Sequence, residues 1–341
     1  MRTRGCIAFV GAAMVALSAL ASSVKADPLK IRADWIVLPG FFAPLIPTVP
    51  QYGPNVYRHY GKSYVVEPIH IQGGSTTITS LAVGDTDLAT LSPQTLVFAV
   101  ANAKLDVHII GLQIATEVPG YLQSYFWVHA SEIKRIDDLK GRVIGISQRG
   151  APASGAAEMV MIKHGFHEPR DYRFLEVPLS AQFAALEEHK VDAAVLVAPF
   201  HLQARQDPGL KPLFGVADAF GTVETVMWAV KSDFLAKNRA ALVDFLEDNI
   251  RMRRWMFDPK TRMDAVKQLA DTAKVPIARF ADWVYSNGDY YYDPDAMVDV
   301  ALLQKNVNDM KTAGIIAQAI DVRPYVDMSL ATEAAASARM R

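Results

Sequence analysis

Helix-like and strand-like segments alternate along this chain, and one short pattern recurs. Thr79 to Leu91 reads TSLAVGDTDLATL and Ala184 to Val195 reads AALEEHKVDAAV. Each has a helix of small and apolar residues, a turn with an acidic residue, and an apolar strand. Ile136 to Ser147, IDDLKGRVIGIS, leads into a similar strand. Such alternation is typical of α/β proteins with parallel sheets. The recurrence predicts two similar α/β lobes.

Length and charge limit the classes of function. A chain of 341 residues with 51% apolar content can bury a large core, and its length favours about two domains. Lys and Arg total 35 against 36 Asp and Glu, which leaves no basic excess for nucleic acid or an anionic membrane surface. We therefore expect no nucleic-acid partner.

The N-terminus has the features of an export signal. Arg2 and Arg4 precede an uncharged run, and small residues before Asp27 suit a cleavage site. We expect residues 1–26 to be a signal peptide and the mature protein to be periplasmic. A single membrane anchor is the alternative, because the run approaches the length of a spanning helix. Cys6 is the only cysteine, so the mature chain would lack disulfides, a thiolate nucleophile and cysteine-ligated metal.

The periodicity predicts the order of the elements. Two strand-like segments, Tyr121–His129 and Thr222–Lys231, are predicted to cross between the lobes. A helix is expected to begin at Pro93, and the prolines at 47, 50 and 54 should keep any helix there short. The other predicted strands are Leu29–Trp35, Val65–Ile71, a strand ending near Leu91, Val107–Ala115, Arg142–Ser147, Tyr172–Val177 and Asp192–Ala198. The other predicted helices are Ser154–Gly165, Ser180–Lys190, Leu235–Phe257, Arg262–Lys274, Ile277–Tyr285 and Pro294–Ala313.

The order of these motifs resembles a known family. The GGS turn, VGDTDLATLSP, IDDLKGRVIGIS, PASGAAEMVMIKHGF, AALEEHKVDAAVLVAPF and YDPDAMVDVALLQKNVNDMKTAGII follow one another as in the nitrate/sulfonate/taurine (NitT/TauT) branch of the periplasmic solute-binding proteins of ABC transporters. The resemblance covers nearly the whole mature chain. The proline-rich stretch from Pro44 to Pro54 departs from it, because relatives usually carry a regular helix there.

The resemblance implies a fold, a division of the chain and partners. The fold would be α/β, of the type II periplasmic binding protein class, with two α/β lobes joined by two crossover strands and the ligand in the cleft. Lobe 1 would comprise residues 27–122 and 227–341, and lobe 2 residues 123–226. The protein would be a monomer that works with an inner-membrane ABC permease and its ATPase.

In lobe 1, the candidate ligand-binding residues lie where helices start. Backbone N–H groups and the positive end of a helix dipole can hold an anion without a formal cation. Gly73, Gly74, Ser75 and Thr76 are the first choice, and Ser92 is another candidate. The alternatives are a plain tight turn at Gly73 and a purely capping role for Ser92.

In lobe 2, further candidates follow strands. Gln148, Arg149 and Ser154 lie between a strand and a helix, and Arg149 could form a bidentate contact with a carboxylate or sulfonate. A loop arginine is more often simply solvated. Pro199 and Phe200 are candidates because the family places cleft residues there. Glu224 would pair with a ligand amine or bind within the hinge.

Aromatic residues are candidates for an apolar wall of the site. Trp35, Phe41 and Phe42 follow the first strand and could contact a ring or alkyl group, with core packing as the alternative. Tyr121, Tyr125 and Trp127 have the same two interpretations. The run Tyr290, Tyr291 and Tyr292 is most simply a packed loop.

The sequence offers no convincing catalytic or metal site. No two histidines have a metal-binding spacing with an acidic partner, and no serine lies in a nucleophile elbow. We therefore expect neither enzyme activity nor a cofactor. The expected function is a periplasmic receptor that captures a small organic anion, such as a sulfonate, a taurine-like solute, or an aromatic or aliphatic carboxylate. A sensory subunit for a membrane kinase and a receptor for a pyrimidine precursor of thiamine are alternatives.

Overall fold

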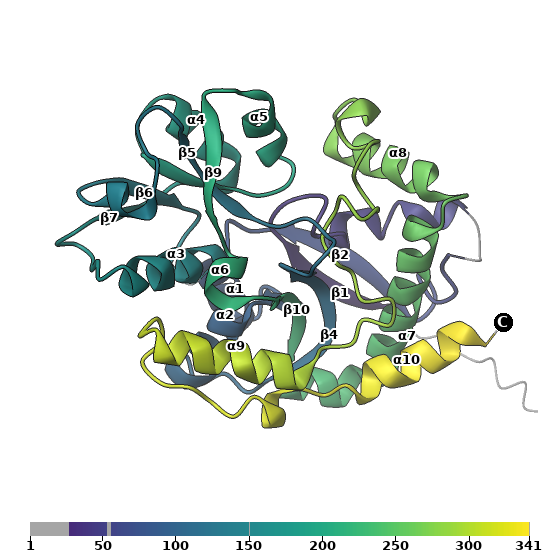
Figure 1. Cartoon of the computed structure of the whole chain (residues 1–341). Helices are drawn as coiled ribbons and strands as arrows, with labels where there is room; N and C mark the ends of the chain where they lie inside the picture. Colours follow the sequence, from purple (N-terminus) through teal and green to yellow (C-terminus); the bar gives the residue numbers. More distant parts are fainter. Residues whose placement is uncertain (1–26, 53–55, 150, 341) are drawn as a thin grey trace, which may run out of the picture.

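The computed structural model describes residues 27–52, 56–149 and 151–340. The predicted signal peptide, residues 1–26, lies outside the described residues. Two sheets form the centres of two lobes, which sit side by side in Figure 1. The predicted α/β fold with two lobes is confirmed.

The sheet of lobe 1 is assembled from two pieces of ladder. Strands β1 and β2 pair in parallel, and β10 pairs antiparallel with both β3 and β4. A parallel bridge between Ala33 and Leu88 joins the pieces, giving the order β2-β1-β3-β10-β4. The bidentate contact of Arg32 with Asp87 fixes this junction, with Nε to Oδ2 at 2.8 Å. The strands are β1 (Leu29–Trp35), β2 (Tyr64–His70), β3 (Ala89–Leu91), β4 (Val107–Thr116) and β10 (Val223–Lys231).

The sheet of lobe 2 repeats the same plan. Its order is β7-β6-β8-β5-β9. In each lobe the strand that follows a crossing, β5 in lobe 2 and β10 in lobe 1, lies second from one edge. Strand β6 pairs in parallel with β7 and β8, and β5 pairs antiparallel with β8 and β9. The strands are β5 (Tyr125–His129), β6 (Val143–Ile146), β7 (Arg173–Glu176), β8 (Ala193–Leu196) and β9 (Leu210–Gly215). The sequence reasoning missed β9.

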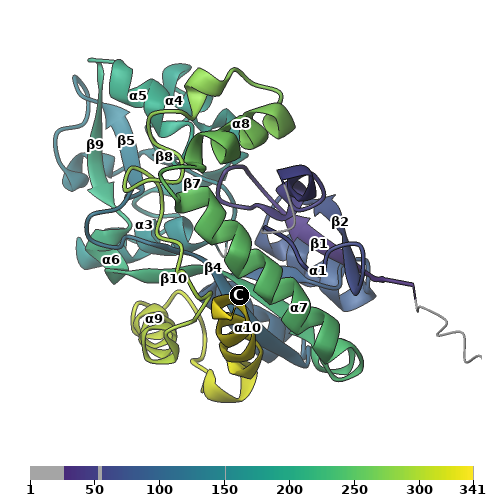
Figure 2. The same cartoon turned by 90° about the vertical axis from the view of Figure 1, so that its right-hand side faces the viewer.

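Helices cover both sheets, and the C-terminal ones return to lobe 1. The long helix α7 runs across lobe 1 with α10 beside it, as both views show (Figures 1 and 2). The helices are α1 (Gly74–Val83), α2 (Pro93–Val97), α3 (Pro152–Lys163), α4 (Gln182–Glu187), α5 (His201–Gln206), α6 (Ala217–Phe220), α7 (Ser232–Phe257), α8 (Arg262–Ala273), α9 (Val300–Thr312) and α10 (Ser329–Arg339). A π-helical turn, Phe98–Asn102, extends α2. No helix among the described residues combines the length and apolar character needed to span a membrane.

The chain passes between the lobes at residues 117–124 and 216–222. The predicted strand from Tyr121 begins only at Tyr125. The N–H of Leu122 donates to the Asp289 carbonyl at 2.9 Å instead of to a neighbouring strand, and the N–H of Ser124 donates to the Glu117 carboxyl. The crossings are therefore irregular, while β5 and β10 belong to the two sheets. The predicted boundaries at 122/123 and 226/227 stay predictions.

Two predicted helices are wrong in part. Residues 277–285 form only a short 3₁₀ helix, Ile277–Arg279, and turns, because the Arg262 guanidinium takes the carbonyls of Ala281 and Val284 at 2.7 and 2.8 Å. The helix expected from residue 294 begins at Val300, because Asp299 caps it by accepting from the N–H of Leu302.

The proline-rich stretch forms short helices, as predicted. Ala43–Leu45 and Val49–Tyr52 are separate 3₁₀ turns, and residues 53–55 lie outside the described part of the chain. The other 3₁₀ helices are Ile136–Leu139, Leu179–Ala181 and Arg323–Tyr325.

Candidate functional site

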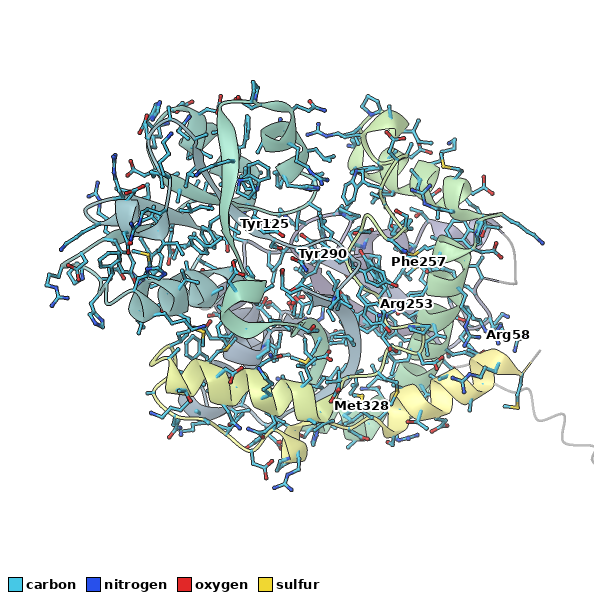
Figure 3. The ribbon with its side chains drawn as sticks, in the orientation of Figure 1. Arg58, Tyr125, Arg253, Phe257, Tyr290 and Met328 are labelled. Atoms are coloured by element: carbon cyan, nitrogen blue, oxygen red, sulfur yellow. The ribbon has the colours of Figure 1, made fainter. Side chains whose placement is uncertain are left out.

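A cavity of about 170 Å³ lies between the two lobes. We call it the interlobe cavity. Tyr290, near the centre of the molecule in Figure 3, contributes to its lining. Both lobes contribute to it, lobe 1 mainly through the ends of β1, β3 and β4 and lobe 2 through the ends of β6 and β8. It is lined by Ile36, Val37, Gly40, Phe41, Gln72, Gly73, Gly74, Thr90, Leu91, Ser92, Thr95, Ile114, Thr116, Glu117, Ser124, Ser147, Gln148, Ala151, Pro152, Ala153, Leu179, Val197, Ala198, Val216, Thr225, Val226 and Tyr290.

Three helices start at the cavity, and their first residues form what we call the helix-start wall: Gly73 and Gly74 of α1, Ser92 and Thr95 of α2, and Ala151, Pro152 and Ala153 of α3. Neither α1 nor α3 has a side-chain hydrogen bond capping its start. Their first N–H groups can therefore serve a ligand.

The start of α2 differs because it is capped by its own side chains. The Ser92 hydroxyl accepts from the N–H of Thr95 at 3.2 Å, and the Thr95 hydroxyl accepts from the N–H of Ser92 at 2.7 Å. This reciprocal arrangement satisfies two donors at the helix start. Ser92 therefore caps its helix and also lines the cavity, while its binding of a solute stays a prediction.

Lobe 2 meets the start of α1 through Gln148. A Cβ atom added to Gly73, whose φ is +155°, would lie 2.1 Å from the Gln148 Oε1. The absence of a side chain at Gly73 therefore permits the close approach. The Ser154 hydroxyl donates to the Gln148 carbonyl instead of capping α3, which fixes the loop that carries Gln148.

The second polar wall comes from the crossings. We call Thr116, Glu117, Ser124 and Thr225 the crossover wall. The hydroxyls of Thr116 and Thr225 lie 2.5 Å apart and join β4 to β10 at the cavity. The Ala198 N–H donates to the Tyr290 hydroxyl at 3.1 Å, a direct contact between lobe 2 and the segment before α9.

Glu117 is the only acidic residue among the described residues that line the cavity, and its residue is 2% exposed. Burial raises the pKa of its carboxyl to about 7, with the nearby Asp218 adding to the shift, while the Ser124 N–H opposes it. Within the described lining there is no Lys, Arg or His. An anionic group in the cavity would therefore be held by neutral donors.

The structure brings five of the predicted site residues to the cavity: Phe41, Gly73, Gly74, Ser92 and Gln148. Ser75 and Thr76 follow directly in the first turn of α1, with exposed side chains outside the lining. Ser154 supports the cavity indirectly through Gln148. That any of them binds a solute stays a prediction.

The other predicted residues lie outside the lining. Phe42 packs in the core against Trp228, and Trp35 packs against His70 with ring centroids 4.3 Å apart. Pro199 and Phe200 lie just beyond the lining residue Ala198, ahead of α5.

Arg149 and Glu224 have partners elsewhere. The Arg149 guanidinium donates to both Glu168 oxygens at 2.8 Å and lies over the Phe174 ring, in an exposed position. Glu224 is buried outside the cavity, where its Oε1 accepts from the N–H of Asp299 at 3.2 Å and burial raises the pKa of its carboxyl to about 8.

Sequence reasoning missed Glu117 and most of the hydroxyl residues. The signal for Glu117 was its place directly after an apolar strand, ahead of the turn-forming Pro119 and Gly120. Tyr290 was considered and assigned to a packed loop.

A second hollow lies on lobe 2 near the segment before α9. It is larger, about 420 Å³, and is lined by Tyr121, Leu122, Gln123, Tyr125, Trp127, His201, Arg205, Pro212, Asn287 and Gly288. The only described helix that begins in it, α5, has six residues, too short for a strong dipole. The interlobe cavity is the better candidate because it unites both lobes and three helix starts.

Three of the solved structures that this chain resembles are described as binding proteins. The alkanesulfonate-binding protein SsuA from Xanthomonas axonopodis pv. citri, bound to MOPS, is 17% identical with a TM-score of 0.69, and the match covers 89% of this chain and 100% of that one. The periplasmic aliphatic sulphonate binding protein SsuA from Escherichia coli is 18% identical with a TM-score of 0.65, covering 89% and 99%. The periplasmic nitrate-binding protein NrtA from Synechocystis PCC 6803 is 14% identical with a TM-score of 0.68, covering 92% and 90%.

At these identities the likeness establishes the fold, which is that of the periplasmic binding proteins, as predicted. No curated protein matches the sequence. The family described as NMT1/THI5 like matches residues 65–256, which is more than half of the chain. The chain therefore belongs to the NMT1/THI5-like family.

Proposed function

We propose that this protein is the periplasmic solute receptor of an ABC importer, which captures a small organic anion in the interlobe cavity and delivers it to an inner-membrane permease. The observation that carries the proposal is the cavity between two lobes onto which the uncapped starts of α1 and α3 open. Binding alone is proposed, with no reaction.

The chemistry of the lining supports an organic solute. Backbone N–H groups at two helix starts can hold a sulfonate or carboxylate, with the helix dipoles adding a favourable potential. Apolar side chains such as Ile114, Leu179 and Val226 can cover an alkyl or aromatic body. A solute held by both lobes would bind the closed arrangement better and shift the population toward it.

Thermal unfolding against a panel of organic sulfonates and carboxylates, with nitrate and sulfate included, tests the binding role. A solute that binds only the folded protein raises its midpoint by mass action. The variant Val197→Trp should fill the cavity and abolish the shift, whereas Val83→Trp, at a position 68% exposed on α1, should keep it. A shift that survives in Val197→Trp would place binding elsewhere.

Delivery is tested by uptake of the labelled solute into cells that lack the gene. We expect uptake to be lost in the deletion strain and restored by the unaltered protein, but not by Val197→Trp. Normal uptake in the deletion strain would contradict a role in transport.

A further inference from the structure

The Glu117 carboxyl is held at the cavity without a cation from the protein. Its hydrogen-bonding partners are all neutral: the N–H of Ser124, at 3.2 and 3.3 Å from the two oxygens, the Ser124 hydroxyl and the backbone of Ala217. None of the ion pairs among the described residues includes Glu117. A buried carboxylate usually has a cationic partner, because burying a charge without one is costly.

The backbone holds Glu117 in this position at a cost. Its φ is +62°, in the left-handed region that non-glycine residues seldom adopt. The Thr222 hydroxyl donates to the Glu117 carbonyl at 3.2 Å, which ties the first crossing to the second. Such backbone strain persists only where the surroundings enforce it. The fold thus directs a carboxyl to the cavity where an apolar residue would pack more easily.

Asp218, a charged group that acts on Glu117, is also acidic. Asp218 at the start of α6 raises the pKa of the Glu117 carboxyl, and the Asp218 side chain is itself occupied by the N–H of Gly215 at 2.8 Å. Among the described residues, the Lys163 ammonium donates to the Asp218 backbone carbonyl at 3.3 Å, and no ion pair involves either carboxyl. The local potential therefore favours a cationic group from a bound solute.

The rest of the cavity favours the opposite charge. The helix-start wall offers N–H groups at α1 and α3, and apolar residues such as Ile36, Val37 and Ile114 lie among the lining. A solute that satisfies every part of this lining has an acidic group, an apolar body and an amine.

We propose that Glu117 is the residue that selects the solute, by pairing with an ammonium group, so that the preferred ligands are small zwitterions in which an apolar spacer separates an amine from a sulfonate or carboxylate. This inference rests on the proposed function, since it assigns the chemistry of the same cavity. The amine would donate to the Glu117 carboxylate while the acid accepts from the helix-start wall.

Three pairs of solutes that differ only by the amine test the inference by calorimetry at neutral pH. They are 3-aminopropanesulfonate with propanesulfonate, 5-aminopentanoate with pentanoate, and 4-(aminomethyl)benzoate with 4-methylbenzoate. The unaltered protein should bind the amino member of at least one pair about tenfold to a hundredfold more tightly, the range of a charged hydrogen bond. In Glu117→Gln that preference should fall to about twofold or less. The control Glu224→Gln, a buried carboxyl outside the cavity, should keep it.

The outcomes separate the two proposals. If the amine-free members bind as tightly as the amino members to the unaltered protein, or if Glu117→Gln keeps the preference, the inference is overturned and the proposed function stands. If no member of any pair binds, both are overturned. The comparison within each pair needs no variant, so it remains decisive even if Glu117→Gln folds poorly.

Discussion

The two polar walls of the interlobe cavity differ in the charge that they present. The helix-start wall offers backbone N–H groups at the uncapped starts of α1 and α3, whereas the crossover wall offers the Glu117 carboxyl and hydroxyls. The first wall can hold an anion with no cationic side chain, and the second can hold a cation. The contrast indicates that the cavity recognises a dipole rather than a single charge.

The largest effect is expected from closing the helix-start wall. Gly73→Ala should weaken binding of every acidic solute by tenfold or more, because the new Cβ would lie 2.1 Å from the Gln148 Oε1 and displace that side chain. Calorimetry measures the loss. The matched control is Gly84→Ala at the other end of α1, where φ is +82° and no atom lies within 4 Å. It should destabilise the protein by about 1 kcal/mol and leave affinity unchanged. Equal affinities for the two variants would contradict a role for this wall.

Two buried carboxyls, Glu117 in the crossover wall and Glu224 outside the cavity, should make the stability of the protein depend on pH. Burial raises the pKa of Glu117 to about 7 and that of Glu224 to about 8. Between the unfolded pKa near 4.5 and these values, the folded protein binds more protons than the unfolded chain. The free energy of unfolding therefore falls as pH rises through this window and stays reduced above it.

Replacement of either carboxyl by an amide should remove that carboxyl's share of the loss of stability at high pH. Glu117→Gln and Glu224→Gln should each raise the unfolding midpoint by several degrees at pH 9 and change it little at pH 5. The estimate assumes about 1–3 kcal/mol for an unsatisfied buried polar group and about 2–4 °C per kcal/mol. Thermal unfolding without solute at both pH values measures it. A larger gain at pH 5 than at pH 9 would show that the assigned directions are wrong.

A smaller effect is expected at the capped start of α2. Ser92→Ala should lower the free energy of unfolding by about 1 kcal/mol, because the N–H of Thr95 loses its acceptor. Affinity for solute should change by less than about threefold. Urea unfolding and calorimetry give the two values. Unchanged stability together with lost binding would show that Ser92 serves the solute and not the helix.

The smallest effect is expected at Arg149. Its guanidinium is occupied by Glu168 in an exposed position, so Arg149→Ala should cost about 0–1 kcal/mol of stability and less than about twofold in affinity. The same two measurements apply. A tenfold loss of affinity would mean that Arg149 leaves Glu168 and reaches the solute.

Much of the architecture could be predicted from local patterns. The strand Leu29–Trp35, the helix starting at Pro93 and the turn at Gly73 all follow from periodicity, capping and glycine, which act within a few residues of the chain. Residues 277–285 could not be predicted in this way, since Arg262 of α8 takes the Ala281 carbonyl and Asp289 takes the Tyr285 N–H, the two groups that would pair in the last turn of a helix. The sequence of this segment gives no indication of such contacts with residues outside it.

The cavity lining was most readily predicted where the backbone defines it, although Phe41 and Gln148 were also among the candidates. Gly73, Gly74 and Ser92 were found because helix starts have a recognisable composition. Glu117 was missed because its burial and its partners depend on both crossings and on α6. Arg149 was favoured for its charge, yet its partners Glu168 and Glu176 come from a later part of lobe 2.

Hydrogen exchange of backbone amides, with and without the tightest-binding solute of the three pairs, tests the central claim most directly. We expect slower exchange at residues 74–76 of α1 and at 153 and 154 of α3, whose N–H groups would hold the acid. It predicts little change at Thr95 in α2, whose N–H already donates to Ser92. Protection confined to the second hollow, around Tyr125 and His201, would contradict it.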